Sequence, residues 1–244
     1  DKDPEKAQAM VDQHGGKVYE TADAMFADPE IDVVSVCLPT FLHREFTERA
    51  FSAGKHVFCE KPMALNVADA DAMIAAAKAA GKELMIGHCI RFWPEYVKLK
   101  SLVESGELGQ LLSLNLTRYG AFPHWSSENW LADPSKAGGG VLDMHIHDTD
   151  YALYLCGDPD SMVSHGTMDD RGASHVFTTM TFGPTVVQVE GGWNLPHHTP
   201  FKMTFRAIFE NGAAIWEGGP LTIYRDNHDP EVVQFEAMSA AGGG

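Results

Sequence analysis

The first third of the chain alternates short apolar runs with longer amphipathic stretches. The apolar runs cover residues 33–38, 56–59 and 84–86, and helical patterns at 43–53 and 66–80 separate them. Continuous apolar runs joined by helices are typical of parallel strands that are covered on both faces. We therefore predict a doubly wound parallel sheet in this part of the chain.

After about residue 91 the pattern becomes rich in strands. A helix is predicted over 94–105 and a strand over 111–119, and a further helix should end at Gly157. Later segments are rich in Thr, Val, Phe and Trp, alternate in part, and are separated by Gly, Pro and Asn. They cover residues 174–182, 185–194, 201–210 and 221–225. This indicates an α+β domain with an open, largely antiparallel sheet.

The two patterns divide the chain into residues 1–90 and 91–244. In the second domain one sheet face should be left without helices, and we expect apolar side chains such as Phe177, Trp193 and Phe205 on it. Such a face would exceed the apolar patch that monomers usually tolerate. We therefore expect a homodimer or homotetramer that assembles through this sheet.

The composition narrows the range of partners. The chain has 34 acidic against 18 basic residues, a formal charge of −16, which would repel nucleic acid and anionic lipid headgroups. No apolar run approaches the roughly 20 residues that a membrane helix needs. Four scattered cysteines inside apolar runs are typical of reduced, buried thiols. We expect a soluble, cytoplasmic protein with no nucleic-acid or membrane partner.

The first candidate chemical group is the pair Glu60 and Lys61. The pair follows directly on the apolar run 56–59, so it should lie at the carboxyl end of a parallel strand. That end of an open parallel sheet faces the ligand crevice. The alternative is a solvated ion pair at a strand exit, which contributes little.

The second candidate group is Asp143 with His147. They lie four residues apart in a helical stretch after three glycines, so they should share one helix face. A carboxylate beside an imidazole can orient a general base. The alternative is a structural histidine, because this spacing is common.

Together the two segments resemble the Gfo/Idh/MocA oxidoreductase family. Residues 138–150 match its G-G-x-x-x-D-x-x-x-H-x-x-D pattern, and Glu60-Lys61-Pro62 matches its E-K-P signature. Further likeness extends across the chain, as at Pro39 and His43. The resemblance implies that residues 1–90 are a partial dinucleotide-binding Rossmann domain and that residues 91–244 bind substrate and form oligomers.

The family's activity implies a catalytic role for three residues. The protein would be a dehydrogenase that moves hydride between a sugar, cyclitol or related polyol hydroxyl and the nicotinamide of NAD or NADP. Lys61 would favour the alkoxide, Asp143 would hold substrate and base, and His147 would take the hydroxyl proton. A cation near the oxygen and a base near neutrality both lower the barrier to hydride loss.

The same resemblance assigns binding residues. Those for the cofactor would be Asp1, Leu38, Pro39, Thr40, His43, Glu60 and Lys61. Those for the substrate would be Arg91, His124, Trp125, Trp130, Asp143 and His147. No metal is implied.

Several positions depart from the family pattern. The chain has no G-x-G-x-x-G turn, whose backbone amides would hold the pyrophosphate, and the family's C-terminal helices are missing. We therefore expect the chain by itself to turn over little substrate. Asp1 falls where the family has an acidic residue that binds the ribose hydroxyl and favours NAD. Leu131 stands where many members have Arg, and His145 replaces a frequent glycine.

Two other functions remain open on these residues. One is a dinucleotide- or sugar-binding regulatory member, or a truncated remnant, without turnover. The other is a metal-dependent hydrolase that would use His145 and His147 as zinc or iron ligands. The metal reading requires residues 144–146 to form a strand, because a helix points positions two apart in different directions.

Overall fold

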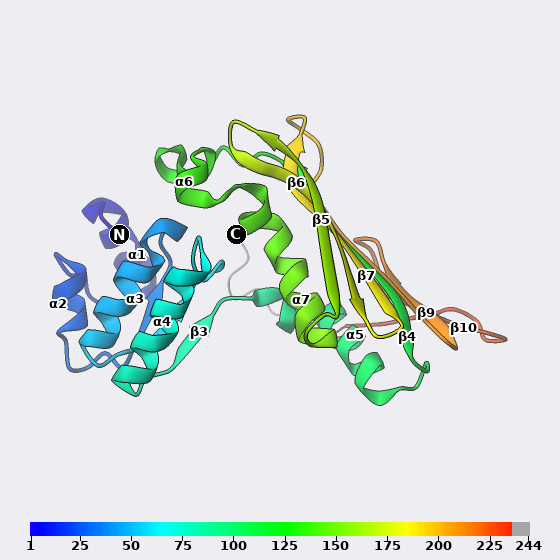
Figure 1. Ribbon diagram of the computed structural model, residues 1–244. Helices are drawn as coiled ribbons and strands as arrows, with labels where there is room; N and C mark the ends of the chain where they lie inside the picture. Colours follow the sequence, from blue (N-terminus) through cyan, green and yellow to red (C-terminus); the bar gives the residue numbers. More distant parts are fainter. Residues whose placement is uncertain (236–244) are drawn as a thin grey trace. The chain divides into compact units, whose positions relative to one another are not determined.

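The computed structural model describes residues 1–235, which form two compact units that divide after Gly87 (Figure 1). The first unit contains α1 (Pro4–His14), α2 (Ala22–Phe26), β1 (Val33–Val36), a 3-10 turn (Thr40–Leu42), α3 (His43–Ser52), β2 (His56–Cys59), α4 (Val67–Ala80) and β3 (Leu84–Ile86).

The sheet of the first unit is parallel in the order β1-β2-β3, as the sequence predicts. Burial alternates along its strands. Val34, Val57 and Cys59 are buried, whereas Val33 is 58% exposed and Met85 49% exposed. The helices α3 and α4 cover one face of this sheet, and Val33 and Met85 lie on the other.

Local signals set the helix ends in this unit. The side chain of Asn66 accepts a hydrogen bond of 2.9 Å from the backbone of Asp69 at the start of α4. The helix ends at Gly81, which adopts the left-handed conformation with φ 60° that glycine tolerates best. Neither α1 nor α2 is predicted from the apolar pattern, and α1 buries no residue.

The second unit begins at His88 and is built on eight strands. Its elements are a 3-10 turn (Cys89–Phe92), α5 (Pro94–Ser105), β4 (Leu111–Ala121), a 3-10 turn (Ser127–Ala132), α6 (Pro134–Ala137), a π-helix (Val141–His145), α7 (Ile146–Cys156), β5 (Ser161–Asp169), β6 (Gly172–Phe182), β7 (Thr185–Leu195), β8 (Lys202–Phe209), β9 (Gly212–Trp216), β10 (Thr222–Arg225) and β11 (Glu231–Val232).

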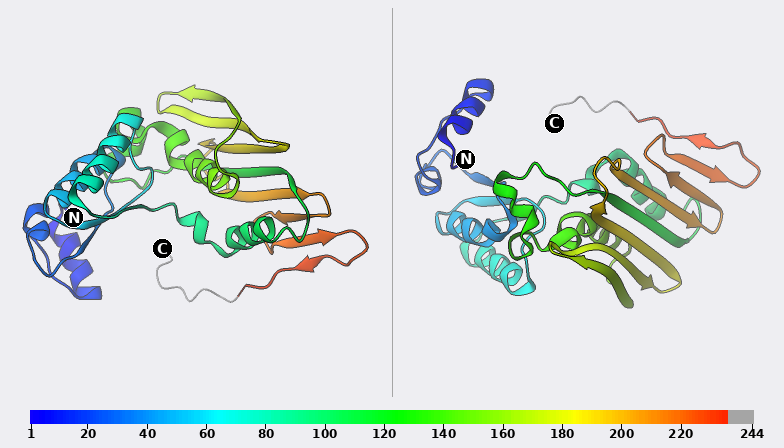
Figure 2. Two further views of the ribbon diagram at one scale, coloured as in Figure 1. Left: turned by 60° about the horizontal axis from the view of Figure 1, so that its bottom comes forward. Right: turned by 90° about the horizontal axis from the view of Figure 1, so that it is seen from above.

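The strands of this sheet follow the order β11-β10-β9-β8-β4-β7-β6-β5. Only β4 and β7 pair in parallel, so the sheet is largely antiparallel, as predicted. The helices α5 and α7 lie on one face, and no helix of residues 1–235 lies on the other (Figures 1 and 2). The buried side chains between helices and sheet include Leu99, Leu116, Tyr151 and Phe205.

The predicted membership of the bare face is partly wrong. Phe177 does lie on it and is 51% exposed, but Trp193 and Phe205 are almost completely buried on the helix-covered face. The register explains the error. Phe177 pairs with Glu190, and Trp193 is an odd number of residues further along the same strand, so it points the opposite way. The bare face therefore mixes polar groups such as Glu190 with its apolar ones.

The expectation that the cysteines are buried holds only in part. All four cysteines are unpaired thiols, but only Cys59 is buried, whereas Cys37 and Cys89 are exposed. Apolar neighbours in the sequence do not ensure burial, because Cys37 lies just beyond the end of β1.

Among residues 1–235, no helix has the length and apolar character required to cross a membrane.

Candidate functional site

The turn after β1 holds the first group of predicted cofactor residues, Leu38, Pro39 and Thr40. The Pro39 carbonyl accepts a hydrogen bond of 2.9 Å from the backbone of Leu42, which closes a 3-10 turn leading into α3. Thr40 is buried, while Leu38 and Pro39 are half-buried. The turn therefore presents backbone and two partly accessible side chains at the carboxyl end of the strand.

Glu60 and Lys61 lie at the carboxyl end of the neighbouring strand. The backbone N–H of Glu60 donates to the Val36 carbonyl at 3.0 Å, which continues the ladder between β1 and β2. The N–H of Lys61 donates to the Glu60 carboxylate at 3.2 Å, and both side chains are half-buried. The structure thus brings Lys61 and the turn after β1 to one edge of the parallel sheet, where open sheets bind ligands.

His43 and Asp1 differ sharply in accessibility. His43 is only 1% exposed, and both of its ring nitrogens face backbone carbonyl oxygens, those of Leu38 and Pro62. It therefore lies beneath the cofactor-side turn rather than on its surface. Asp1 is exposed, and its carboxylate accepts a hydrogen bond of 2.8 Å from the backbone of Asp3.

Glycines let the motif segment of the second unit pack directly on the sheet. A Cβ on Gly140 would lie 2.7 Å from the Ser174 carbonyl oxygen of β6. A Cβ on Gly191 of β7 would lie 2.7 Å from the Cα of His145. The backbones of the motif segment and of the strands cannot easily move apart, so only glycine at these two positions allows them to pack this closely.

Asp143 and His147 are carried by this closely packed segment. Asp143 lies in the π-helix and His147 in the first turn of α7, and both are half-buried. The expected helix is therefore present, but the turn that carries Asp143 is wider than an α-helical turn. Wide turns of this kind occur frequently at functional sites, where they redirect a side chain.

A buried ion pair that the sequence did not indicate supports α7. Arg118 of β4 donates to Asp148 with an Nε–Oδ2 distance of 2.7 Å, and the two side chains are 4% and 0% exposed. Tyr96 of α5 adds a hydrogen bond of 3.4 Å to the same carboxylate. Burial raises the pKa of Asp148, and the guanidinium of Arg118 opposes that rise. The pair therefore fixes the helix that carries His147 to the sheet.

Arg91, a predicted substrate residue, forms a second ion pair with α7. Its guanidinium donates two hydrogen bonds, of 2.8 and 2.5 Å, to the Asp150 carboxylate and lies 4.6 Å from the centre of the Tyr154 ring. The bond to Asp150 is the main reason that the pKa of Arg91 is raised. The guanidinium of Arg91 is thus bonded to Asp150, and a contact between Arg91 and substrate remains a prediction.

His145 is buried against β7 of the second-unit sheet. It is 4% exposed, and burial lowers its pKa to about 4. Its Nδ1 lies 2.9 Å from the hydroxyl of Thr149. Residues 144–146 are helical rather than extended, which contradicts the geometry that a metal site at His145 and His147 requires. Within residues 1–235 no three His, Cys, Asp or Glu side chains are grouped closely enough to hold a metal ion.

The loop after β4 holds the remaining predicted substrate residues. Trp125 is 81% exposed, whereas Trp130 is half-buried against the cluster formed by Leu131 and Trp193. The ring of His124 lies 5.8 Å from that of His197, in the loop that follows β7. Sequence reasoning missed His197. The parallel pairing of β4 and β7 is the relevant signal, because it places the loops that follow both strands at one edge of the sheet.

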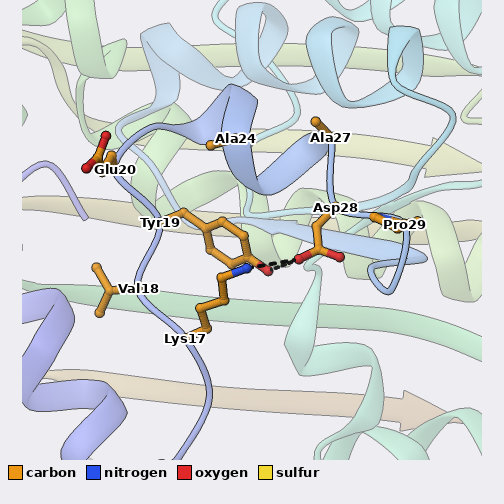
Figure 3. Close-up of a pocket in the computed structure, with 8 residues that line it drawn as sticks. All are labelled: Lys17, Val18, Tyr19, Glu20, Ala24, Ala27, Asp28 and Pro29. Atoms are coloured by element: carbon orange, nitrogen blue, oxygen red, sulfur yellow. Dashed lines mark hydrogen bonds and ion pairs between the residues drawn. The ribbon is translucent and has the colours of Figure 1, made fainter.

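A surface hollow of about 440 Å³ in the first unit is separate from these residues (Figure 3). In it the hydroxyl of Tyr19 donates to Asp28 at 2.6 Å, which lowers the pKa of Asp28 and raises that of Tyr19. Lys17 lies 3.4 Å from the same carboxylate. The predicted site residues do not line this hollow.

Comparison with known families identifies both parts of the chain. Residues 1–88 match the oxidoreductase family with an NAD-binding Rossmann fold, and residues 96–215 match the GFO/IDH/MocA C-terminal domain. The chain therefore belongs to the Gfo/Idh/MocA oxidoreductase family, and the match to the NAD-binding Rossmann model covers its first unit.

Individual relatives give the same result. The chain is 39% identical over 143 residues to a myo-inositol 2-dehydrogenase from Thermotoga maritima, covering 58% of this chain and 41% of that protein. It is 33% identical over 156 residues to a 1,5-anhydro-D-fructose reductase from Ensifer adhaerens, covering 63% and 46%. The structure of an aldose-aldose oxidoreductase from Caulobacter crescentus aligns with a TM-score of 0.82 at 29% identity, covering 95% and 73%. The chain thus spans less than half the length of these two curated relatives.

Proposed function

We propose that this chain belongs to a nicotinamide-dependent dehydrogenase that oxidises a hydroxyl group of a sugar, cyclitol or related polyol. The observation that carries the proposal is the presence of three side chains, a lysine, an aspartate and a histidine, whose chemistry suits this reaction. Lys61 lies just beyond the end of β2, and Asp143 and His147 lie on the segment packed against the second sheet. Relatives named for inositol and anhydrosugar substrates support the substrate class.

Each of these residues has a distinct task in the proposed reaction. Lys61 donates a hydrogen bond to the reacting hydroxyl oxygen and stabilises the negative charge that develops there. His147 accepts the hydroxyl proton, and Asp143 orients substrate and base. Hydride then leaves the carbon as the C–O bond becomes a carbonyl. Bound NAD supplies the acceptor for that hydride.

The chemistry of the described residues fits the nicotinamide and ribose part of a dinucleotide. The turn after β1 and the Glu60–Lys61 segment offer backbone groups, one carboxylate and one cation at the carboxyl edge of the sheet. At Gly87, after β3, a Cβ would lie 3.1 Å from the Phe58 ring, which is tighter than an ordinary contact. Asp1 supports NAD over NADP, because a carboxylate binds the ribose 2′-hydroxyl and repels a 2′-phosphate.

The direct test measures nucleotide reduction by the natural full-length protein. Myo-inositol, several aldoses and 1,5-anhydrosugars are offered with NAD and, separately, with NADP, and formation of reduced nucleotide is followed by absorbance. Lys61→Ala and His147→Ala should each lower kcat by about a hundredfold or more with the fold intact, because both contacts strengthen as the alkoxide forms.

The same assay separates the catalytic proposal from a silent binding member. A regulatory protein would bind nucleotide and sugar in calorimetric titrations and yet reduce no nucleotide with any polyol. Turnover that His147→Ala leaves unchanged would instead remove the role of His147 as the base.

We also propose that the protein assembles as a dimer or tetramer through the bare face of the second-unit sheet. The support is that Phe177 and Val163 are more than half exposed on adjacent strands of this face. Phe177→Glu should lower the mass measured by light scattering at micromolar concentration, and an unchanged mass would exclude this face as the interface. The unpaired cysteines support a reducing compartment such as the cytoplasm.

A further inference from the structure

His43 contacts both of the loops that follow β1 and β2 and carry predicted cofactor residues. Its Nδ1 lies 2.8 Å from the carbonyl oxygen of Pro62, and its Nε2 lies 2.8 Å from that of Leu38. The first carbonyl belongs to the residue after Lys61, and the second belongs to the turn after β1. The histidine therefore links the ends of two neighbouring parallel strands.

The two contacts determine where the protons of the ring must be. A neutral imidazole has one N–H donor and one nitrogen lone pair, whereas a carbonyl oxygen can only accept. With a neutral ring, one of the two contacts would bring a lone pair to 2.8 Å from an oxygen, which is repulsive. Turning the ring over would replace both nitrogens with carbons and lose both hydrogen bonds. Both contacts are favourable only when both nitrogens carry a proton.

Burial makes this arrangement specific to the folded chain. His43 is 1% exposed and Pro62 is also buried, so water cannot readily replace the Pro62 carbonyl as a partner, whereas the contact with Leu38 is partly buried. A buried charge persists only where hydrogen bonds satisfy it, and here each N–H has a partner of good geometry. The first turn of α3 carries the ring, so the helix serves as the rigid support of the link.

We propose that His43 is a doubly protonated positioning residue, an imidazolium that clamps the Pro62 carbonyl to the Leu38 carbonyl and so sets the position of Lys61. Its effect on turnover rests on the proposed function, whereas its proton state does not. His43 would act through Lys61 and the turn, without touching the substrate.

The proton state can be read directly by nitrogen NMR of the chain with labelled histidine at pH 7.5. His56 is the internal control, because its Nδ1 accepts a hydrogen bond of 3.1 Å from the backbone of Glu83 and must carry a lone pair. His43 should show two protonated ring nitrogens of similar shift. His56 should show one protonated and one unprotonated nitrogen. Assignment through bonds from the backbone requires no variant.

A neutral pattern at His43 in the folded chain overturns the proposal, whatever activity the protein has. The positioning role is tested in the natural full-length enzyme with His43→Gln, which keeps one amide donor, and His43→Leu, which keeps none. We expect kcat to fall at least tenfold in the leucine variant and less in the glutamine variant, with His56→Gln within twofold of the parent.

These outcomes separate the two proposals. If the parent enzyme reduces no nucleotide while His43 shows two protonated nitrogens, the dehydrogenase assignment fails and the clamp stands. If the parent turns over and His43→Leu keeps its full kcat while folded, the positioning role is wrong.

Discussion

Replacing Arg118 by methionine should expose how strongly the second unit depends on its buried ion pair. The change keeps an unbranched side chain of similar length but leaves Asp148, which is 0% exposed, without its cation. Removing one partner of a buried pair typically costs about 3–5 kcal/mol, because the remaining charge is uncompensated. The hydroxyl of Tyr96, at 3.4 Å, offsets only part of that loss.

The carboxyl group of Asp148 can avoid this penalty by taking up a proton. The free energy of that protonation is therefore an upper limit on the stability that Arg118→Met removes. Starting from the ordinary pKa of 3.8 for aspartate, protonation at pH 7 costs about 4.4 kcal/mol, and at pH 5 it costs about 1.6 kcal/mol. Without Arg118 the folded chain holds a proton that the unfolded chain releases. Stability of the variant relative to the parent should therefore fall as pH rises from 5 to 7.

Urea denaturation of the parent and the variant at both pH values tests this reasoning. Arg225→Met is the matched control, because its ion pairs with Glu231 and Glu107 are exposed and should each be worth less than about 1 kcal/mol. Adding Asp148→Leu to Arg118→Met should recover most of the lost stability, since it removes the orphaned charge. A loss that is equal at pH 5 and pH 7, or that the second substitution deepens, would refute the account.

Two further predictions concern the packing of the motif segment. Gly191→Ala should lower the free energy of unfolding by about 1–3 kcal/mol, because its Cβ would lie 2.7 Å from the His145 Cα, whereas Gly219→Ala, which meets nothing within 4 Å, should change it by less than about 0.5 kcal/mol. Burial lowers the pKa of His145 from 6.5 to about 4, so the unfolded chain binds its proton first as pH falls. Stability should therefore decrease between pH 6.5 and 4, by up to about 3 kcal/mol, and His145→Gln should remove this part of the decrease in urea titrations. An imidazole titrating near pH 6.5 in the folded chain would contradict the second prediction.

Local signals made much of the fold predictable. The strand at 56–59, the helix at 94–105 and the strand at 84–86 are found at their expected bounds, because apolar runs and glycine stops mark them within a few residues of sequence. The helix α1 was missed because it buries nothing, and β5 because all nine of its residues are exposed. A reading that depends on apolar patterns detects elements by what they bury, so exposed elements escape it.

The errors at the site have a different origin. Whether Trp193 faces the helices depends on the register of β7 against its neighbours, which no single segment determines. Arg118 and Asp148 are thirty residues apart, and each has an ordinary setting in the sequence. The partners of His43 are backbone carbonyls, which leave no mark on residue identity. Sequence patterns predicted the candidate catalytic residues, but the groups that hold them in place became apparent only in three dimensions.

The distribution of charge around His147 follows from these supporting contacts. The motif segment carries Asp143, Asp148 and Asp150 within eight residues, in a chain of net charge −16. A site of that density would oppose the alkoxide that the proposed reaction forms and the phosphates of a dinucleotide. Arg118 neutralises Asp148, and Arg91 neutralises Asp150, both within the second unit. Two of the three carboxylates therefore serve to anchor α7. The proposed role in orienting substrate and base is assigned to the third carboxylate, Asp143.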